Sequence, residues 1–221
     1  KGADAVAWCP RCETAISQHE MLTEDYKELT HDSVFLSFPI TGSENEYLMV
    51  WTTTPWTIPA NTAIAVDPDL DYSLMETGAK KYWVAKGAKD RIFIGTKAKE
   101  IKSVKGSKLV GLRYTAAFDD LPKVKTVIGA KNDKFHTVMA TDNLILPITT
   151  EEGTGMVHIA TSSGAEDFKL GKKIGLPIIS VIADDASYLS DLGFLSGQNA
   201  KKHPEIILDF LKKMDSEGKH F

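Results

Sequence analysis

The sequence has few cysteines, no long apolar run and little excess charge. Its 221 residues include only Cys9 and Cys12, which is too few for a disulfide-stapled fold. No apolar stretch approaches the roughly 20 residues that a membrane-spanning helix needs, so we expect no membrane partner. The net charge of −4 argues against nucleic-acid binding over the whole surface. With 43% hydrophobic and 25% charged residues, the composition is that of an ordinary globular protein with a real core.

The charge is unevenly placed along the chain. Residues 80–113 contain eleven lysines and arginines but only two acidic residues, Asp90 and Glu100. A lysine-rich segment is most often a solvated face. If the protein meets an RNA, this segment is the first candidate for contacts with phosphates.

The two cysteines lie in the string WCPRC, where their spacing allows a redox pair or half of a zinc site. No strand-then-helix pattern of the thioredoxin kind surrounds them. No second pair of cysteines follows, and no pair of histidines has ligand spacing. We therefore expect no complete zinc site within this sequence.

The chain starts at Lys1, and we expect it to be a piece of a larger protein. Residues 1–20 have little regular period and are interpreted as a connecting edge of a parent domain that carries half a zinc knuckle. Residues 21–221 are expected to form one unit. No internal repeat or low-complexity tract is present.

The first half of the unit is predicted to be a succession of short strands. Alternating apolar and polar positions and the turn residues between them place these strands at residues 33–40, 46–53, 62–66, 71–76 and 82–85. Residues 88–102 have a looser period, which we interpret as helical. Short strands joined by tight turns favour a closed or strongly curled antiparallel sheet.

The second half mixes strands and helices. Strands are predicted at residues 106–114, 123–128, 134–139, 155–160 and 178–182. One helix is predicted from Gly164 through Lys173, ended by Gly175, and an amphipathic helix at residues 204–213 follows a loop at 184–197. The fold class is therefore α+β, with a central, barrel-like, antiparallel-rich sheet and surrounding helices.

The string WTTTPWTIPAN, from Trp51 to Asn61, is the most distinctive local feature. Pro55 cannot donate to a sheet ladder, so the chain must turn after the threonines. Side chains alternate along a strand, which places the hydroxyls of Thr52 and Thr54 on one wall and Thr53 on the other. Threonines before a proline are common in strands, but the whole string is much more specific than that.

A second long string, EEGTGMVHIATSSGAEDF, lies about a hundred residues further on. In it, His158 stands in an apolar strand, where a histidine is more often a satisfied core residue than a catalyst. Asp167 stands in the first turn of the predicted helix. A carboxylate there either interacts with the helix N-terminus or holds a cationic ligand group.

In content and in order, the two strings resemble the motifs of the editing domain inserted in isoleucyl-tRNA synthetases. Valyl and leucyl relatives carry a TTRP-type string, so Thr54 points to the isoleucyl branch. The resemblance implies a barrel with surrounding helices, and it implies another cysteine pair, beyond the editing domain, that matches WCPRC. It also implies that ATP is used by a synthetic domain outside this chain and that no cofactor or metal acts in this part.

The resemblance implies roles for individual residues. Asp167 binds the α-ammonium of the mischarged amino acid, and His158 lines the side-chain pocket and excludes the larger, correct one. Threonine hydroxyls are poor general bases, so we expect Thr52, Thr53 and Thr54 to position a water and the ester carbonyl. Asn61 adds its amide to the same wall. Trp51 and Trp56 pack there or support the terminal adenine of a tRNA.

One departure from the family concerns the loop before Asp167. Where the family has an Ala-Pro pair, this chain continues from Ala160 with Thr161, Ser162 and Ser163. Without that proline the loop backbone is freer, and the position of Asp167 is open to change.

The sequence thus predicts an editing domain that hydrolyses valyl groups wrongly attached to the tRNA for isoleucine, and valyl-adenylate as a second substrate. Two alternatives are an editing domain of valyl or leucyl specificity and a silent insertion that only binds the tRNA acceptor end. The expected partners are tRNA and the rest of a parent synthetase. We expect a monomer in the cytoplasm, with an organelle as the alternative compartment.

Overall fold

The computed structural model describes residues 4–17, 19–20, 33–130 and 132–219. These residues form three sheets, four α-helices and three short 3-10 helices. The elements are β1 (Trp8–Cys9), β2 (Thr14–Ala15), β3 (Val34–Pro39), β4 (Glu46–Thr52), η1 (Pro55–Ala60), β5 (Ala63–Val66), β6 (Asp71–Thr77), β7 (Lys80–Ala85), α2 (Lys89–Ile92), β8 (Lys99–Lys105), η2 (Gly106–Lys108), α3 (Pro122–Gly129), β9 (Val138–Ala140), β10 (Met156–Ile159), α4 (Ala165–Ile174), η3 (Gly193–Leu195) and α5 (Glu205–Ser216).

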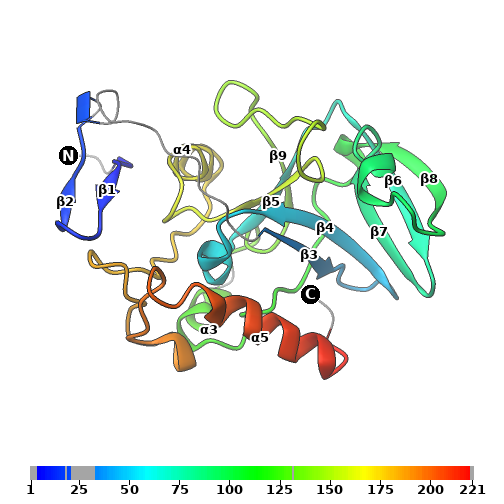
Figure 1. The fold of residues 1–221 in the computed structure, drawn as a ribbon. Coiled ribbons are helices and arrows are strands. Elements are labelled where there is room, and N and C mark those ends of the chain that lie inside the picture. The colour runs from blue at the N-terminus through cyan, green and yellow to red at the C-terminus, as the bar shows by residue number, and fades with distance from the viewer. Residues whose placement is uncertain (1–3, 18, 21–32, 131, 220–221) are drawn as a thin grey trace.

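The largest sheet has the order β3-β4-β7-β6-β8, in which only β4 and β7 pair in parallel. A three-stranded sheet has the order β10-β5-β9, and β1 pairs with β2 in a hairpin. Figure 1 shows the large sheet at one end of the molecule and the hairpin at the other, with α4 between them. The α+β class is confirmed. The barrel is not: the described strands form open sheets with free edges.

Strand β5 is the centre of the core because neighbours cover both of its faces. Ile64 and Val66 pack into the main apolar cluster with residues of the large sheet and of α5. Ala63 and Ala65 face a smaller cluster with Leu170 of α4. This strand follows η1 directly, so the core fixes the string that runs from Trp51 to Asn61.

The strands predicted up to residue 85 are present with bounds within two residues, and so are the strand β10 and the helix α4; the predicted helix α5 is present but ends three residues later, at Ser216. Gly175 ends α4 in the left-handed region, at φ 77°, as a terminating glycine does. The helix expected at 88–102 is wrong beyond Ile92, because Lys99–Lys105 pairs with β6 as an edge strand. Pairing with a neighbouring strand outweighs a weak local period.

Three predicted strands are also wrong. Residues 123–128 lie in helix α3, which Pro122 starts at its first position, where a missing N–H costs nothing. Residues 106–114 form η2 and a turn, with isolated bridges at Arg113 and Tyr114. Residues 178–182 contribute one isolated bridge, at Ile182. Of residues 134–139, only the end belongs to a strand, β9.

None of the helices in the described ranges is long and apolar enough to cross a membrane. In the same ranges, no group of three or more histidine, cysteine or acidic side chains is placed to hold a metal ion. Cys9 and Cys12 are free thiols at the turn of the β1–β2 hairpin.

Candidate functional site

The threonine string lies where β4 ends and η1 begins. Pro55 occupies the first turn of η1, and Thr54 is its N-cap residue. The backbone N–H of Thr54 donates to Oγ1 of Thr52 at 3.1 Å, and the two hydroxyl oxygens lie 3.3 Å apart. Thr52 is buried, whereas Thr53 and Thr54 are exposed. The structure thus brings the hydroxyls of Thr52 and Thr54 together, but through a turn and not through strand alternation, because β4 ends at Thr52.

The two sequence strings meet at His158. Its Nε2 lies 2.9 Å from Oγ1 of Thr57, in η1, and its Nδ1 lies 3.4 Å from Nδ2 of Asn61. The Asn61 amide nitrogen also donates to the carbonyl of Ala63, while its oxygen accepts from the Tyr114 hydroxyl at 2.7 Å. An amide NH₂ can only donate, so Nδ1 of His158 is the acceptor and Nε2 carries the proton.

The hydrogen bonds of His158 continue through Thr57 to the backbone of Thr54. Nε2–H of His158 donates to Thr57, and the Thr57 hydroxyl donates to the carbonyl of Thr54 at 2.8 Å. Burial lowers the pKa of His158 to about 4, so the ring is neutral near pH 7. Both ring nitrogens are therefore engaged with the protein, and His158 has no free lone pair for proton transfer. The predicted role in excluding a larger side chain needs only the bulk of the ring.

Asp167 lies in the first turn of α4, and one oxygen of its carboxylate, Oδ2, accepts from the backbone N–H of Ala160 at 2.8 Å. The other oxygen has no hydrogen-bond partner in the described part of the chain. Burial raises the pKa of Asp167 to about 6, although the bond from Ala160 opposes this shift. The carboxylate is half-buried, and no cationic side chain of the described residues pairs with it. Among the described residues, this anion has no counter-charge.

Trp51 packs against the second string. A Cβ placed on Gly153 would lie 3.1 Å from the Trp51 ring, so glycine allows this close approach. Gly155 is tighter, because its Cβ would lie 2.2 Å from Cβ of Ala85, and its φ is +72°. The hydroxyl of Tyr72 donates to the carbonyl of Gly155 at 2.7 Å. Glycines in the second string therefore serve backbone packing.

The loop that lacks the family's proline is held by its own side chains. Oγ1 of Thr161 donates to the carbonyl of Pro177 at 2.7 Å, and Oγ of Ser162 donates to the carbonyl of Ile179 at 2.6 Å. The methyl group of Thr161 packs on Gly171 of α4, where a Cβ would come within 2.4 Å. Two hydroxyls thus tether the loop that precedes Asp167.

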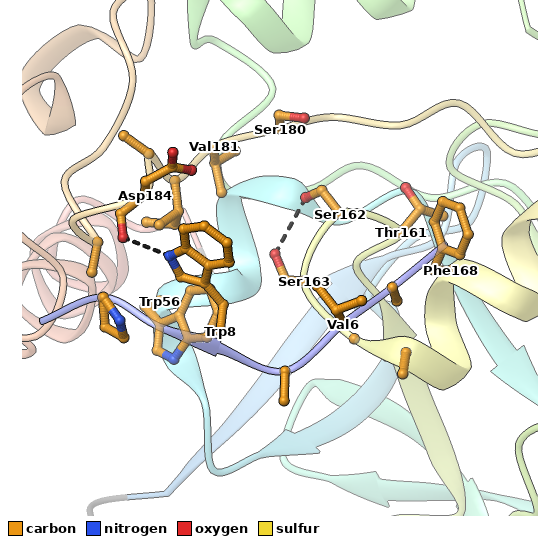
Figure 2. A pocket seen from close by; sticks show the side chains of 18 of the residues that line it. Val6, Trp8, Trp56, Thr161, Ser162, Ser163, Phe168, Ser180, Val181 and Asp184 are labelled. Atoms are coloured by element: carbon orange, nitrogen blue, oxygen red, sulfur yellow. Dashed lines mark hydrogen bonds between the residues drawn. The ribbon is translucent and has the colours of Figure 1, made fainter. Parts of the chain in front are cut away.

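A cavity of about 830 Å³ lies beside this loop. Figure 2 shows Trp8 and Trp56 on one side of it and Thr161, Ser162, Ser163 and Phe168 on another. The N-terminal hairpin reaches it through Trp8, whose indole N–H donates to the carbonyl of Asp184 at 2.9 Å. The cavity lies between the two strings, but its walls include none of the predicted site residues; of the first string, only Trp56 lines it.

Sequence reasoning missed several residues of this region. Trp8 and the two serines line the cavity, yet the WCPRC string drew attention only to its cysteines and the serines only to a missing proline. The sequence pattern predicts Tyr114 only as a strand residue, whereas in the structure its hydroxyl donates to the side-chain oxygen of Asn61. No local pattern marks such long-range partners.

Comparison with known proteins identifies the family of the chain. No family model matches it. It is 42% identical over 213 residues to the isoleucine–tRNA ligase of Pyrococcus horikoshii, a match that covers 93% of this chain and 19% of that protein. It is 35% identical over 225 residues to the enzyme of the same name from Saccharolobus islandicus, covering 99% of this chain and 21% of the relative. The chain belongs to the isoleucine–tRNA ligase family.

Within that family the chain spans about a fifth of the length of the curated relatives. Its fold is that of the CP1 domain. The solved structure of GlLeuRS-CP1, from a leucyl-tRNA synthetase, superposes with a TM-score of 0.60 at 14% identity, covering 83% of this chain and 97% of that one. The predicted membership of the isoleucyl branch and the CP1 editing-domain fold are thereby confirmed.

Proposed function

We propose that this chain of the isoleucine–tRNA ligase family hydrolyses valyl esters wrongly attached to the tRNA for isoleucine, and valyl-adenylate as a second substrate. The observation that carries the proposal is the half-buried Asp167 carboxylate, which has one oxygen without a partner among the described residues and a pKa raised by burial. Such a group binds a cation strongly, because the ligand supplies the missing counter-charge.

The α-ammonium of an aminoacyl ester is that cation in our proposal. Oδ2 of Asp167 is fixed by the N–H of Ala160, so Oδ1 points in a defined direction. A charge-assisted hydrogen bond from the ammonium would then fix both the position and the direction of the amino acid. Binding would return the pKa of Asp167 toward its ordinary value, because a nearby positive charge favours the ionised carboxylate.

Thr52 and Thr54 are assigned to positioning of the attacking water and of the ester carbonyl. Their hydroxyls lie 3.3 Å apart, and no base activates either of them in the described residues. A threonine nucleophile would need such a base, whereas a water held in place gains from proximity alone. We assign Thr53 to the same edge, and Trp51 to packing that supports it.

His158 and Asn61 form the wall behind these threonines. The neutral ring of His158 restricts the space for the amino-acid side chain, and Asn61 fixes the ring through Nδ1. One methylene in an apolar pocket is worth only about 1–3 kcal/mol, a magnitude for which isoleucyl-tRNA synthetase is itself the standard example. A second site that admits valine and rejects isoleucine by bulk provides the remaining selectivity.

The cavity lined by Trp56 and the 161–165 loop is our candidate for the terminal adenosine. Its volume of about 830 Å³ falls within the range of small-ligand pockets, about 300–1,000 Å³. An indole gives a base a stacking surface, and Ser162 and Ser163 provide hydroxyls. Valyl-adenylate ends in the same nucleoside, so the same cavity would serve it.

The tRNA itself would meet the edge of the large sheet. Strand β8 is exposed along nearly its whole length, and Lys99 and Lys102 on it are exposed. Lysines also protect an edge strand from pairing with other chains, which explains part of this pattern without RNA. The parent synthetase, which we propose acts as a monomer in the cytoplasm, would supply the remaining tRNA contacts and the ATP-dependent chemistry.

The test is deacylation of tRNA for isoleucine that carries valine, compared with the same tRNA carrying isoleucine and with a protein-free blank. We expect the chain to accelerate loss of valine and to spare isoleucine. Equal loss in protein and buffer, together with retained tRNA binding, would support a silent acceptor-end module instead. Faster loss from mischarged tRNA for valine or leucine would assign a neighbouring specificity.

A further inference from the structure

His136 lies between two hydrogen-bond acceptors. Its Nε2 is 3.3 Å from the backbone carbonyl of Asn61, and its Nδ1 is 3.5 Å from Oδ1 of Asp119. A neutral imidazole carries one N–H, which serves only one of these oxygens. The other nitrogen then turns a lone pair toward an oxygen lone pair. The arrangement is complete only with one additional proton.

The hydrogen bonds of Asp119 also indicate that one proton is missing. Its Oδ2 accepts from the backbone N–H of Ala116 at 3.0 Å, but its Oδ1 is buried without a hydrogen-bond partner. In the described ranges it is the one buried side-chain oxygen or nitrogen in that state. Buried polar atoms without partners are rare in native proteins and call for a specific explanation.

We propose that Asp119 and His136 hold one proton between them and that this pair positions Asn61 in the wall of the candidate site. The proton sits on Oδ1 of Asp119 and is donated to Nδ1 of His136. The opposite ring nitrogen, Nε2–H, is thereby fixed as the donor to the carbonyl of Asn61. Asp119 and His136 are positioning residues, since Asn61 lies between them and His158.

Electrostatics favours this neutral form over an ion pair. Burial raises the pKa of Asp119 to about 6 and lowers the pKa of His136 to about 4. Both directions oppose a carboxylate beside an imidazolium and favour a carboxylic acid beside a neutral ring. The charged groups around the pair act in the same sense: Arg113 lowers the pKa of His136, and Asp120 raises that of Asp119.

The ring of His136 is held firmly enough to transmit the effect. It stacks on Tyr114, with centroids 5.0 Å apart, and on Phe135, with centroids 3.8 Å apart. Tyr114, whose pKa burial raises well above its ordinary value, also donates to Oδ1 of Asn61. His136 itself has φ +53°, a left-handed conformation that is uncommon for a non-glycine residue.

Asn61 then joins the pair to the site. Its backbone carbonyl accepts from His136, its amide oxygen accepts from Tyr114, and its amide nitrogen donates to His158. Loss of the proton would place the Asp119 carboxylate against the lone pair of Nδ1. His136 would turn or shift, and Asn61 would lose the donor to its carbonyl.

The proton can be observed without any substrate. In NMR spectra of the full chain, we expect Nε2 of His136 to stay protonated from pH 5 to pH 8. Nδ1 should change from a hydrogen-bonded to a free acceptor as the pH rises. In Asp119→Asn, the amide NH₂ replaces the acid O–H, and this step should vanish. Asp120→Asn, which alters an exposed neighbouring carboxylate, should keep it. An imidazolium at pH 5, no step in the parent chain, or the same step in Asp119→Asn would overturn the proposal.

The activity arm rests on the proposed function, and the NMR arm does not, so the two fail separately. Asp119→Asn should retain deacylation within about twofold and lose only the fall in rate that accompanies loss of the proton from the pair, while the rise in rate that accompanies ionisation of Asp167 remains. Asp119→Leu, which offers no donor, should lower the rate about tenfold or more, as expected when a site loses its geometry. Equal losses in both variants, or an unchanged pH profile in Asp119→Asn, would contradict a positioning role. If Asp119→Leu does not fold, the pH profile of Asp119→Asn and the NMR step still test the proposal.

Discussion

Nε2 of His158 lies 2.9 Å from Oγ1 of Thr57, across 101 residues of sequence. This contact joins the two strings that sequence comparison singles out, and it leads on to the carbonyl of Thr54. The threonine edge is therefore not an independent loop. It is held from behind by a buried polar network, whose members hydrogen-bond to one another.

Thr57→Val tests this network. The valine has the shape of threonine but no hydroxyl, so Nε2–H of His158 and the carbonyl of Thr54 each lose a partner. We expect the free energy of unfolding, measured in urea, to be about 1–3 kcal/mol lower than that of the parent chain. Thr57→Ser keeps the hydroxyl and should lose much less. Equal losses in the two variants would mean that the hydroxyl contributes nothing.

Asp167→Asn should make the protein more stable and less active. The raised pKa means that the folded state holds the Asp167 proton more tightly than the unfolded chain does. Its contribution to stability is complete below the ordinary value of 3.8 and is lost as the pH rises through about 6. The asparagine variant should therefore gain on the order of 1–3 kcal/mol at pH 7.5, with a smaller gain near pH 4.

The same variant should lose most of the valyl-ester hydrolysis at pH 7.5, because its amide carries no negative charge for the ammonium. Glu166→Gln is the matched control, since it removes the adjacent exposed carboxylate of the same helix turn. Its activity should stay near that of the parent chain. Comparable loss in both variants would assign the effect to general charge rather than to Asp167.

Gly155→Ala should be far more damaging than Gly42→Ala. Both glycines have a positive φ, +72° and +81°, which costs an alanine about 1–2 kcal/mol. At Gly42 nothing lies within 4 Å of the new Cβ, whereas at Gly155 the Cβ meets that of Ala85 at 2.2 Å. We expect a further loss of about 1–3 kcal/mol from that overlap. Thermal unfolding of the two variants gives the comparison, and similar losses would refute the close packing.

Thr161→Val should loosen the loop before Asp167. It removes the hydrogen bond to the carbonyl of Pro177 and keeps the methyl contact with Gly171. The backbone amides of residues 163–167 should exchange with solvent several-fold faster, as expected for a bond worth about 1 kcal/mol. Ser163→Ala, which removes a hydroxyl bonded only to Ser162 in the described residues, should change little. Unchanged exchange in Thr161→Val would show that the loop does not depend on this tether.

Sequence predicts this fold best where a residue's local role is also its tertiary role. The strands around Pro55 and the helix ended by Gly175 were found because proline and glycine restrict the backbone in any context. Helix α3 was missed because its valines and isoleucine favour strands, while Pro122 and the packing of Val124 decide for a helix. Short strands joined by tight turns predict a barrel, but they do not determine whether a sheet edge closes, and here the sheets are open.

In the candidate site, too, some contacts follow from the local sequence and others do not. The hydroxyls of Thr52 and Thr54 meet, but the turn after β4 brings them together, whereas the sequence pattern predicts the contact through strand alternation. That both nitrogens of His158 are engaged depends on Thr57 and Asn61, and the pairing of Asp119 with His136 depends on loops that follow no period. Such partners are distant in sequence, and only the folded chain brings them together.

The central claim is that Asp167 holds the α-ammonium of the bound amino acid. The most direct test measures the affinity for two ligands: adenosine that carries valine through a non-hydrolysable amide, and the same molecule without the amino group. Both affinities are measured for the parent chain and for Asp167→Asn. We predict that removing the amino group weakens binding to the parent chain at least tenfold, because a charge-assisted hydrogen bond is worth about 1.5–3 kcal/mol. The same change should hardly weaken binding to the asparagine variant. An equal loss of affinity in the two proteins would contradict the claim.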